Sequence, residues 1–470
     1  MEKSKYLLKN IGILTLSNFS SKILVFLLVP LYTSVLSTAE YGSYDLCVST
    51  ATLLYPIFTL NIVEAVMRFL MDKTKDKKDI TSIGLKYVII SVLLFGILML
   101  LFSVTGWWND IHGYENLIFL YFITFVFNQF LIQFTKGIDQ VKEMAIAGVL
   151  GTITTIVSNI LFLWVFKFGL NGFFVANIFS QLVSALYLGI QTKIWKYINL
   201  NKINVPLQKE MLRYSVPLIA TTIGWWVNST SDKYVVSVLL GVSANGLLSV
   251  SYKIPQIMAT FQSIFTQAWS ISAIKEYGEQ DTAKFYGNTF TIVNLFICAA
   301  CSWLILLTKP LAHILYAKDF YQAWQYVPFL LIASVLNCAS GLLGPILSAQ
   351  KNSKAMMWSA LIGAGANIIL NITLVRIIGI QGATIATVIC SYIIYAVRKT
   401  AVKKEITIDH YATILITWIL LSIQATMEIY ISIWWLEALT MIILLIINVP
   451  TLKKLIKSVQ GALADIKNKK

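Results

Sequence analysis

The chain has 470 residues, of which 57% are hydrophobic and only 13% are charged, and its formal net charge is +15. Soluble domains carry about 25% charged residues, so this chain has too little polar surface to cover a water-soluble body of its size. The composition excludes a soluble globular protein and indicates an all-α integral membrane protein solvated mostly by lipid.

Apolar segments recur from one end of the chain to the other, and each is long enough to cross a membrane as a helix of about 20 residues. The first of them is too long for the core of a cleavable signal, so we interpret it as a span. The last two are almost contiguous, which leaves thirteen spans as the alternative to fourteen. The fourteen predicted spans are residues 11–36, 43–70, 84–106, 115–135, 144–166, 172–192, 211–238, 245–271, 285–308, 322–347, 356–377, 381–397, 411–430 and 433–450.

Basic residues indicate which side of the membrane each loop faces. With the N-terminus in the cytoplasm, the predicted inside segments hold 29 Lys and Arg, whereas the outside loops hold Lys167, Lys309 and Lys318. This bias predicts that both termini are cytoplasmic. The positive charge is spread over short loops that face anionic lipids, so no nucleic-acid partner is expected. The basic stretches 191–213 and 451–470 could lie in the interface or form solvated segments.

Short matches predict that the first twelve spans are two six-helix halves. Residues 169–172 recur as residues 379–382, and the pair Leu36 and Gly42 recurs as Leu240 and Gly246. Parallel repeats of this kind place the substrate path between two lobes around a central cavity. The predicted domains are an N-lobe of residues 1–200, a C-lobe of residues 201–405, and residues 406–470, which hold helices 13 and 14 and a basic cytoplasmic tail.

Charged residues inside the predicted spans mark the candidate site, because each costs about 2.5–3.5 kcal/mol at the bilayer centre unless it is paired or faces water. They occur in the first two helices of each half. A cavity lined by several cations would bind an anion such as pyrophosphate. The cationic candidates are Lys22, Arg68, Lys233 and Lys253.

Acidic and amide residues near these cations have two interpretations. For Asp45, Glu64 and Asp232, neutralisation of a nearby cation is favoured over substrate contact, and Glu64 is placed four residues before Arg68, where the two could pair. Alternatively, the acids take part in coupling to an ion. Amides that would add hydrogen bonds to the cavity are Asn18, Asn61 and Gln267.

No motif points to catalysis or to a metal site. The sequence has no Walker A loop, HExxH or GxSxG motif. Cys298 and Cys301 form a CxxC motif inside an apolar run without a nearby His, so we expect buried helix residues rather than a redox or zinc site. We therefore expect no enzyme, no metal and no cofactor, with transport coupled to an ion gradient or to the membrane potential.

Several stretches resemble the polysaccharide flippases of the multidrug/oligosaccharidyl-lipid/polysaccharide exporter superfamily. The resemblance extends from about residue 8 to residue 400 and depends on the order and spacing of motifs that are individually loose. The motifs are residues 40–45 (EYGSYD), 232–237 (DKYVVS), 249–255 (SVSYKIP), 267–270 (QAWS) and 347–352 (LSAQKN).

This resemblance implies two six-helix lobes that rock by alternating access in the bacterial inner membrane. It implies a substrate, an undecaprenyl-pyrophosphate-linked oligosaccharide such as an O-antigen repeat unit, and partners in anionic lipids, a polysaccharide polymerase and glycosyltransferases. Related lipid flippases bind the pyrophosphate with cations at the positions of Lys22, Arg68, Lys233 and Lys253, although Arg is often expected where this chain has Lys. Helices 13 and 14 resemble the appended pair of the lipid II flippase, which helps to form a groove for the lipid tail.

Two other functions fit the sequence less well. A multidrug cation exporter of the same superfamily would need acidic cavity residues, for which Asp45, Glu64 and Asp232 are the candidates. The excess of cations and the polysaccharide-type motifs argue against it. A membrane glycosyltransferase usually needs a large outside loop with catalytic residues, and the predicted outside loops are short.

Overall fold

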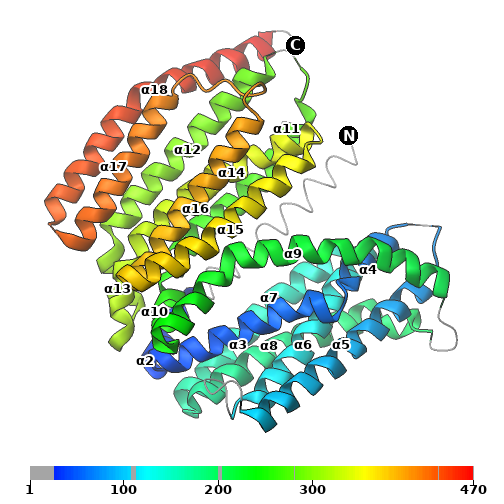
Figure 1. Ribbon diagram of the computed structural model, residues 1–470. Coiled ribbons are helices and arrows are strands. Elements are labelled where there is room, and N and C mark those ends of the chain that lie inside the picture. Colours follow the sequence, from blue (N-terminus) through cyan, green and yellow to red (C-terminus); the bar gives the residue numbers. More distant parts are fainter. Residues whose placement is uncertain are drawn as a thin grey trace. The chain divides into compact units, whose positions relative to one another are not determined.

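The prediction of an all-α protein is confirmed by the computed structural model. The model describes residues 26–72, 74–106, 113–199, 204–279, 281–431 and 433–468, without the side chains of residues 452 and 454–468, and this part of the chain contains helices and no strands. The chain divides into two compact units (Figure 1). Unit 1 comprises Met1–Tyr234, Gly241–Gly246 and Leu315–Phe320, and unit 2 comprises Val235–Leu240, Leu247–Ile314 and Tyr321–Lys470.

Ten helices of the described chain are long and apolar enough to cross a membrane, or eleven with one bent pair counted as a span. One face of the third predicted span is apolar and exposed, since Leu93, Ile97, Leu100 and Val104 are all exposed at helical spacing. The protein is therefore a multi-pass membrane protein. The count of fourteen stays a prediction, because most of the first predicted span lies outside the described residues.

Unit 1 is a helical bundle in which α6 contacts α5, α4 and α8, and α7 contacts α8. A π-helix, η2, follows α7 directly. Most of the long helix α9 belongs to this unit. The elements are α2 (Val29–Val35), α3 (Thr38–Phe58), α4 (Ile62–Leu70), α5 (Lys77–Thr105), α6 (Glu115–Gly137), α7 (Val141–Asn159), η2 (Ile160–Val165), α8 (Gly169–Thr192), η3 (Ile194–Tyr197) and α9 (Val205–Leu240).

The second predicted span is broken into α3 and α4. Helix α3 begins with a capping box, in which the Ser37 Oγ accepts from the Glu40 N–H at 3.2 Å and the Glu40 carboxylate accepts from the Ser37 N–H at 2.7 Å. It ends shortly after Pro56, where Leu60 and Asn61 both adopt a left-handed conformation with φ of 51°. Helix α4 then starts at an angle of 62° to α3. A break of this kind leaves backbone N–H and C=O groups without partners in the helix, and transporters use such groups to bind substrates and ions within the membrane.

Two glycines allow the backbones of α3 and α10 (Val242–Ser251) to touch within unit 1. A Cβ atom on Gly42 would lie 2.1 Å from the Val242 carbonyl oxygen, and a Cβ on Gly246 would lie 2.0 Å from the Thr38 carbonyl oxygen. The Asn245 amide also donates to the Gly42 carbonyl at 3.1 Å. These are the glycines that the sequence repeat identified as equivalent.

Unit 2 is built around α14, the most deeply buried of the candidate spans. Helices α11, α12, α16 and α17 all contact it, and α17 and α18 lie side by side at one edge of the unit (Figure 1). The elements that follow α10 are α11 (Pro255–Lys275), α12 (Thr282–Leu306), α13 (Thr308–Leu315), η4 (Lys318–Tyr326), α14 (Val327–Ala349), α15 (Ser353–Ile378), α16 (Ile380–Ala401), α17 (Tyr411–Tyr430) and α18 (Trp434–Asn468).

Hydrogen bonds from large side chains connect the helices of unit 2. The Trp269 indole donates to the Leu342 carbonyl at 2.8 Å, which fixes α11 on α14. The buried Arg398 guanidinium of α16 donates to the Ser359 hydroxyl and to the Ser340 carbonyl, both at 3.1 Å. All five cysteines of the protein are buried and unpaired, as the apolar runs around them predicted.

Candidate functional site

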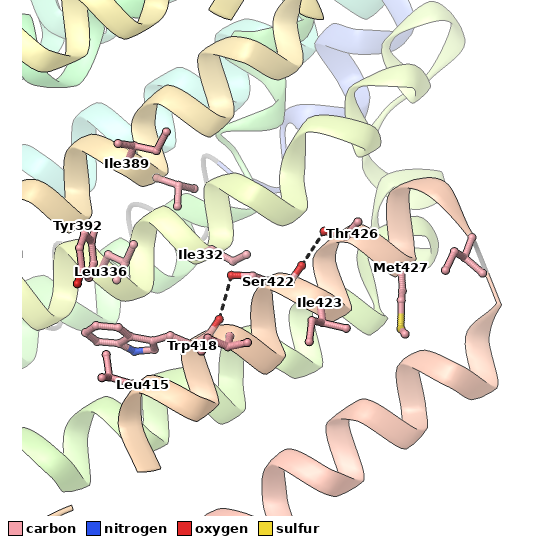
Figure 2. Close-up of a pocket in the computed structure, with 13 residues that line it drawn as sticks. Ile332, Leu336, Ile389, Tyr392, Leu415, Trp418, Ser422, Ile423, Thr426 and Met427 are labelled. Atoms are coloured by element: carbon pink, nitrogen blue, oxygen red, sulfur yellow. Dashed lines mark hydrogen bonds between the residues drawn. The ribbon is translucent and has the colours of Figure 1, made fainter. Parts of the chain in front are cut away.

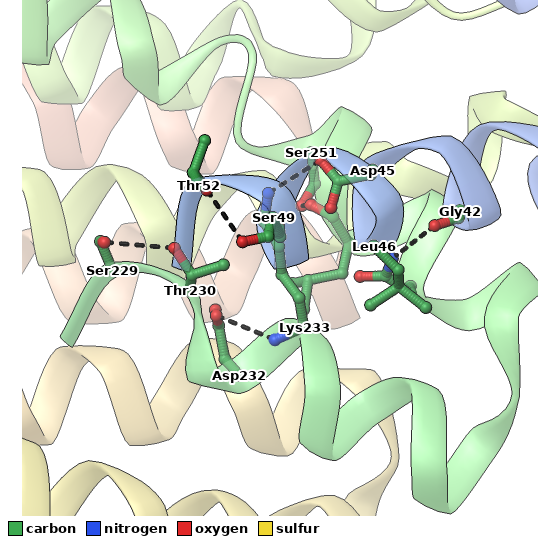
Figure 3. A network of polar contacts seen from close by, with 12 residues as sticks. Gly42, Asp45, Leu46, Ser49, Thr52, Ser229, Thr230, Asp232, Lys233 and Ser251 are labelled. Carbon is green, nitrogen blue, oxygen red and sulfur yellow. Dashed lines mark hydrogen bonds and ion pairs between the residues drawn. The ribbon is translucent and has the colours of Figure 1, made fainter. Parts of the chain in front are cut away.

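Lys233 is joined to Asp45 in an ion pair between α9 and α3 (Figure 3). The Lys233 Nζ lies 2.9 Å from the Asp45 Oδ1, and each side chain is about one-sixth exposed, at 17% and 16%. The neighbouring Asp232 is buried, and its carboxylate accepts from the Lys233 backbone N–H at 3.0 Å. One predicted cation is therefore balanced by one of the predicted acids.

Further hydrogen bonds align α9 with α3 around this pair. The Tyr234 and Thr50 hydroxyl groups lie 2.6 Å apart. About two turns earlier on α9, the Trp226 indole donates to the Ser49 carbonyl at 3.1 Å. The ion pair is thus part of an ordered contact between two helices rather than an isolated surface bridge.

The other predicted polar residues of α3 and α4 also have partners on neighbouring helices. The Asn61 amide, at the break between α3 and α4, donates to the Thr222 hydroxyl of α9 at 3.5 Å. Glu64 accepts a hydrogen bond from the Gln133 amide of α6 at 2.7 Å. Gln133 is therefore the partner of Glu64, and no ion pair between Glu64 and Arg68 is present in the part of the chain that the structure describes.

Arg68 lies at a cavity of about 360 Å³ between the end of α4, the loop after it and the start of α9. Three cationic side chains line this cavity, and two carboxylates and two aromatic rings accompany them. The lining residues are Arg68, Phe69, Asp72, Lys75, Glu210, Arg213 and Tyr214.

Lys75 and Glu210 form an ion pair at the wall of this cavity. The Lys75 Nζ lies 2.5 Å from the Glu210 Oε1 and 4.4 Å from the centre of the Phe69 ring. Hydrogen bonds from Thr74 lower the pKa of Asp72, so that carboxylate is ionised at neutral pH. Among the described residues that line the cavity, three cations face two carboxylates, which gives one net positive charge and two guanidinium groups at its wall.

Arg68 and Lys233, the predicted cations of unit 1 that the structure describes, thus lie far apart rather than in one cluster. Arg68 lies beside Arg213 at the start of α9, and Lys233 lies near the other end of that helix. With a rise of 1.5 Å per residue, Lys233 and Arg213 are separated by roughly 30 Å along α9. Lys253 is half-buried where the chain breaks between α10 and α11, and Gln267 is exposed on α11, both in unit 2. Lys22 and Asn18 lie outside the described residues.

An apolar groove of about 790 Å³ runs between α14, α16 and α17 in unit 2 (Figure 2). Aliphatic and aromatic side chains such as Ile332, Ile389 and Trp418 make up most of its wall. The hydroxyl groups of Ser422 and Thr426 donate to carbonyls of their own helix at 2.9 and 2.8 Å, so their donors are already used within α17. The groove can hold an extended apolar chain.

Some charged residues were missed at the sequence level. Arg213 was counted with the basic inside segment and not with the cations of the site. The expectation that charged residues within the spans fall in the first two helices of each half is wrong for Glu428 and Glu437, which are buried in the thirteenth and fourteenth predicted spans. A search of every predicted span for acidic residues would have found the two glutamates, whereas the position of Arg213 opposite Arg68 depends on tertiary structure.

The chain is similar to two families of membrane proteins. The family model described as "Polysaccharide biosynthesis protein" matches residues 7–269, and the MatE model matches residues 217–373. The probable low-salt glycan biosynthesis flippase Agl15 of Haloferax volcanii is 23% identical over 272 residues, which cover 55% of this chain and 54% of that protein. The chain thus spans about half the length of this curated relative in the alignment.

Solved structures share the fold. The lipid II flippase MurJ in an inward closed conformation is 17% identical, with a TM-score of 0.73 over 94% of this chain and 99% of that chain. An inward-facing multidrug resistance MATE family transporter of the MOP superfamily is 16% identical, with a TM-score of 0.62 over 82% of this chain and 95% of that chain. Because the first family model matches more than half of its length, this chain belongs to the polysaccharide biosynthesis protein family and has the fold of the MOP superfamily.

Proposed function

We propose that the protein is a flippase for lipid-linked oligosaccharides. Its substrate is an undecaprenyl-pyrophosphate-linked repeat unit, which moves by alternating access from the cytoplasmic to the outer leaflet for surface polysaccharide synthesis. The observation that carries the proposal is the cavity at the end of α4, where Arg68 and Arg213 offer two guanidinium groups and the net charge is positive. The membership of the polysaccharide family supports the same class of substrate.

Guanidinium groups suit a diphosphate because their planar donors match two phosphate oxygens at once. The positive-inside pattern predicts that this cavity faces the cytoplasm, where a newly made lipid-linked sugar is present. We infer that Arg68 and Arg213 first engage the diphosphate there. Lys22 and Lys253 are proposed to bind it at later stages, and the apolar groove of unit 2 is proposed to hold the polyprenyl tail.

Arg68→Ala and Arg213→Ala are each expected to slow transport by about 10- to 100-fold, because a hydrogen bond to a charged group contributes roughly 1.5–3 kcal/mol. The measurement uses purified protein in vesicles that contain a fluorescent undecaprenyl-pyrophosphate saccharide, and follows its arrival in the opposite leaflet. Lys78→Ala is the control, since Lys78 is exposed on the same predicted side but does not line the cavity. Unchanged rates in both arginine variants would remove the support for an anionic cargo at this cavity.

Ser422→Trp is expected to reduce transport several-fold, because the indole would occupy part of the apolar groove and exclude the lipid tail. The same vesicle assay measures the effect. Ile416→Trp is the matched control: Ile416 is exposed on the same helix, α17, and does not line the groove. Equal rates for the two tryptophan variants would argue against a role for the groove in binding the tail.

The second candidate function is a multidrug cation exporter, which the MatE match over residues 217–373 favours. Such a protein would bind its drug at an acidic residue, and the buried Asp232 is the candidate on α9. A dye-efflux assay in cells separates the two functions. Efflux that is abolished by Asp232→Asn would support the exporter, whereas absence of efflux would support the flippase.

A further inference from the structure

Two glutamates are buried together at one end of the α17–α18 pair in unit 2. Glu428 lies in the last turns of α17, and Glu437 lies in the first turn of α18. The side chain of Glu428 is 3% exposed and Glu437 is 2% exposed. Carboxyl groups within membrane helices are expensive to bury and most often serve a function.

A lysine lies beside this pair. The Lys309 Nζ is 3.7 Å from the Glu428 Oε1, donates to the Glu428 carbonyl at 3.4 Å, and lies 4.5 Å from the centre of the Trp324 ring. Helices α12, α14 and α18 all pack on α17. In the described part of unit 2, Lys309 and Glu437 are the charged groups that interact electrostatically with Glu428.

The charges of this group do not balance without a proton. Two ionised carboxylates and one ammonium would leave a net negative charge in a buried place, whereas a single proton makes the group neutral. An ionised carboxylate only accepts hydrogen bonds, so two neighbouring buried carboxyl groups can bond to each other only when one of them is protonated. The buried Glu437 Oε1 accepts no hydrogen bond from the described residues, so it remains available to a proton or a polar ligand.

We propose that Glu428 and Glu437 form a proton-binding site, in which they share one proton and Lys309 balances the remaining negative charge. On release, the O–H bond of one carboxyl group breaks, the proton passes to water, and a second carboxylate remains; binding reverses this step. Lys309 is one of the few basic residues of the predicted outside loops, so the site exchanges protons with the outside. This inference goes beyond the proposed function, because it concerns the ion and does not depend on the cargo.

Infrared difference spectroscopy of the purified full-length protein tests the site directly. At about pH 7, far above the usual carboxyl pKa of about 4.3, the wild type is expected to show the carbonyl band of a protonated carboxylic acid. Glu428→Gln and Glu437→Gln should each remove this band from the spectrum, and Glu279→Gln, at an exposed glutamate of the same unit, should keep it. Persistence of the full band in both variants, or its absence from the wild type, would overturn the proposal.

A further variant keeps the proposal testable if the glutamine variants do not fold. Lys309→Met removes the positive charge that favours ionisation, so the carboxylic acid band should persist to higher pH than in the wild type. An identical loss of the band with pH in Lys309→Met and in the wild type would overturn the site. None of these measurements involves transport, so their failure is distinguishable from failure of the proposed function.

Discussion

Lys233→Met is expected to lower the free energy of unfolding by about 3 kcal/mol. This value is at the lower end of the range for breaking a buried ion pair, because about one-sixth of each side chain remains exposed. The substitution leaves the Asp45 carboxylate between α3 and α9 without its cation. Thermal unfolding of the purified protein in detergent measures the loss.

The double variant Asp45→Asn with Lys233→Met is the matching test, because it removes both charges and should recover most of the stability. Lys78→Met, at an exposed lysine, should change little. Recovery of stability without recovery of transport would assign Lys233 a direct role in binding the diphosphate. Recovery of both would make the ion pair structural, and a double variant as unstable as the single one would show that the pair is not the source of the effect.

Gly42→Ala is expected to destabilise the protein by about 1–3 kcal/mol, the usual range for overpacking. The new Cβ atom would lie 2.1 Å from the Val242 carbonyl oxygen, and this atom belongs to the backbone and cannot rotate away. Helices α3 and α10 must therefore separate, which also lengthens the hydrogen bond from Asn245 to the Gly42 carbonyl. The melting temperature and the yield of monodisperse protein are the measurements.

Gly189→Ala in α8 is the control for this substitution. No atom lies within 4 Å of the Cβ position there, so the change should leave stability unaltered or raise it by up to about 1 kcal/mol through helix propensity. Equal melting temperatures for the two alanine variants would contradict a tight contact at Gly42.

Sequence patterns predicted the helices well because hydrophobicity and length are local properties. The predicted span 84–106, for example, largely coincides with α5, whose Leu93 and Leu100 are exposed. Breaks within helices were less predictable: the left-handed conformations of Leu60 and Asn61 divide a segment whose hydrophobicity is continuous. The family resemblance is confirmed, whereas the fourteen spans and the three predicted domains stay predictions.

The candidate site was predicted in part, for a clear physical reason. Sequence identifies which residues are costly to bury, but it does not identify the partners that reduce this cost. The spacing of Glu64 and Arg68 suggested a local pair, yet Gln133 from α6 is the partner of Glu64. Arg213 joins Arg68 only because α9 begins beside the end of α4. Such contacts between distant segments have no signal in a single sequence.

The crossing of α3 and α10 has the reciprocity of an isologous interface. The same spacing of 204 residues separates Thr38 from Val242 and Gly42 from Gly246, and each glycine meets the carbonyl of the other segment's equivalent residue. Two identical subunits make such a contact across a two-fold axis. In this single chain, the contact constrains both segments in the same way. A side chain at either Gly42 or Gly246 would collide with the backbone of the other segment unless that segment moved.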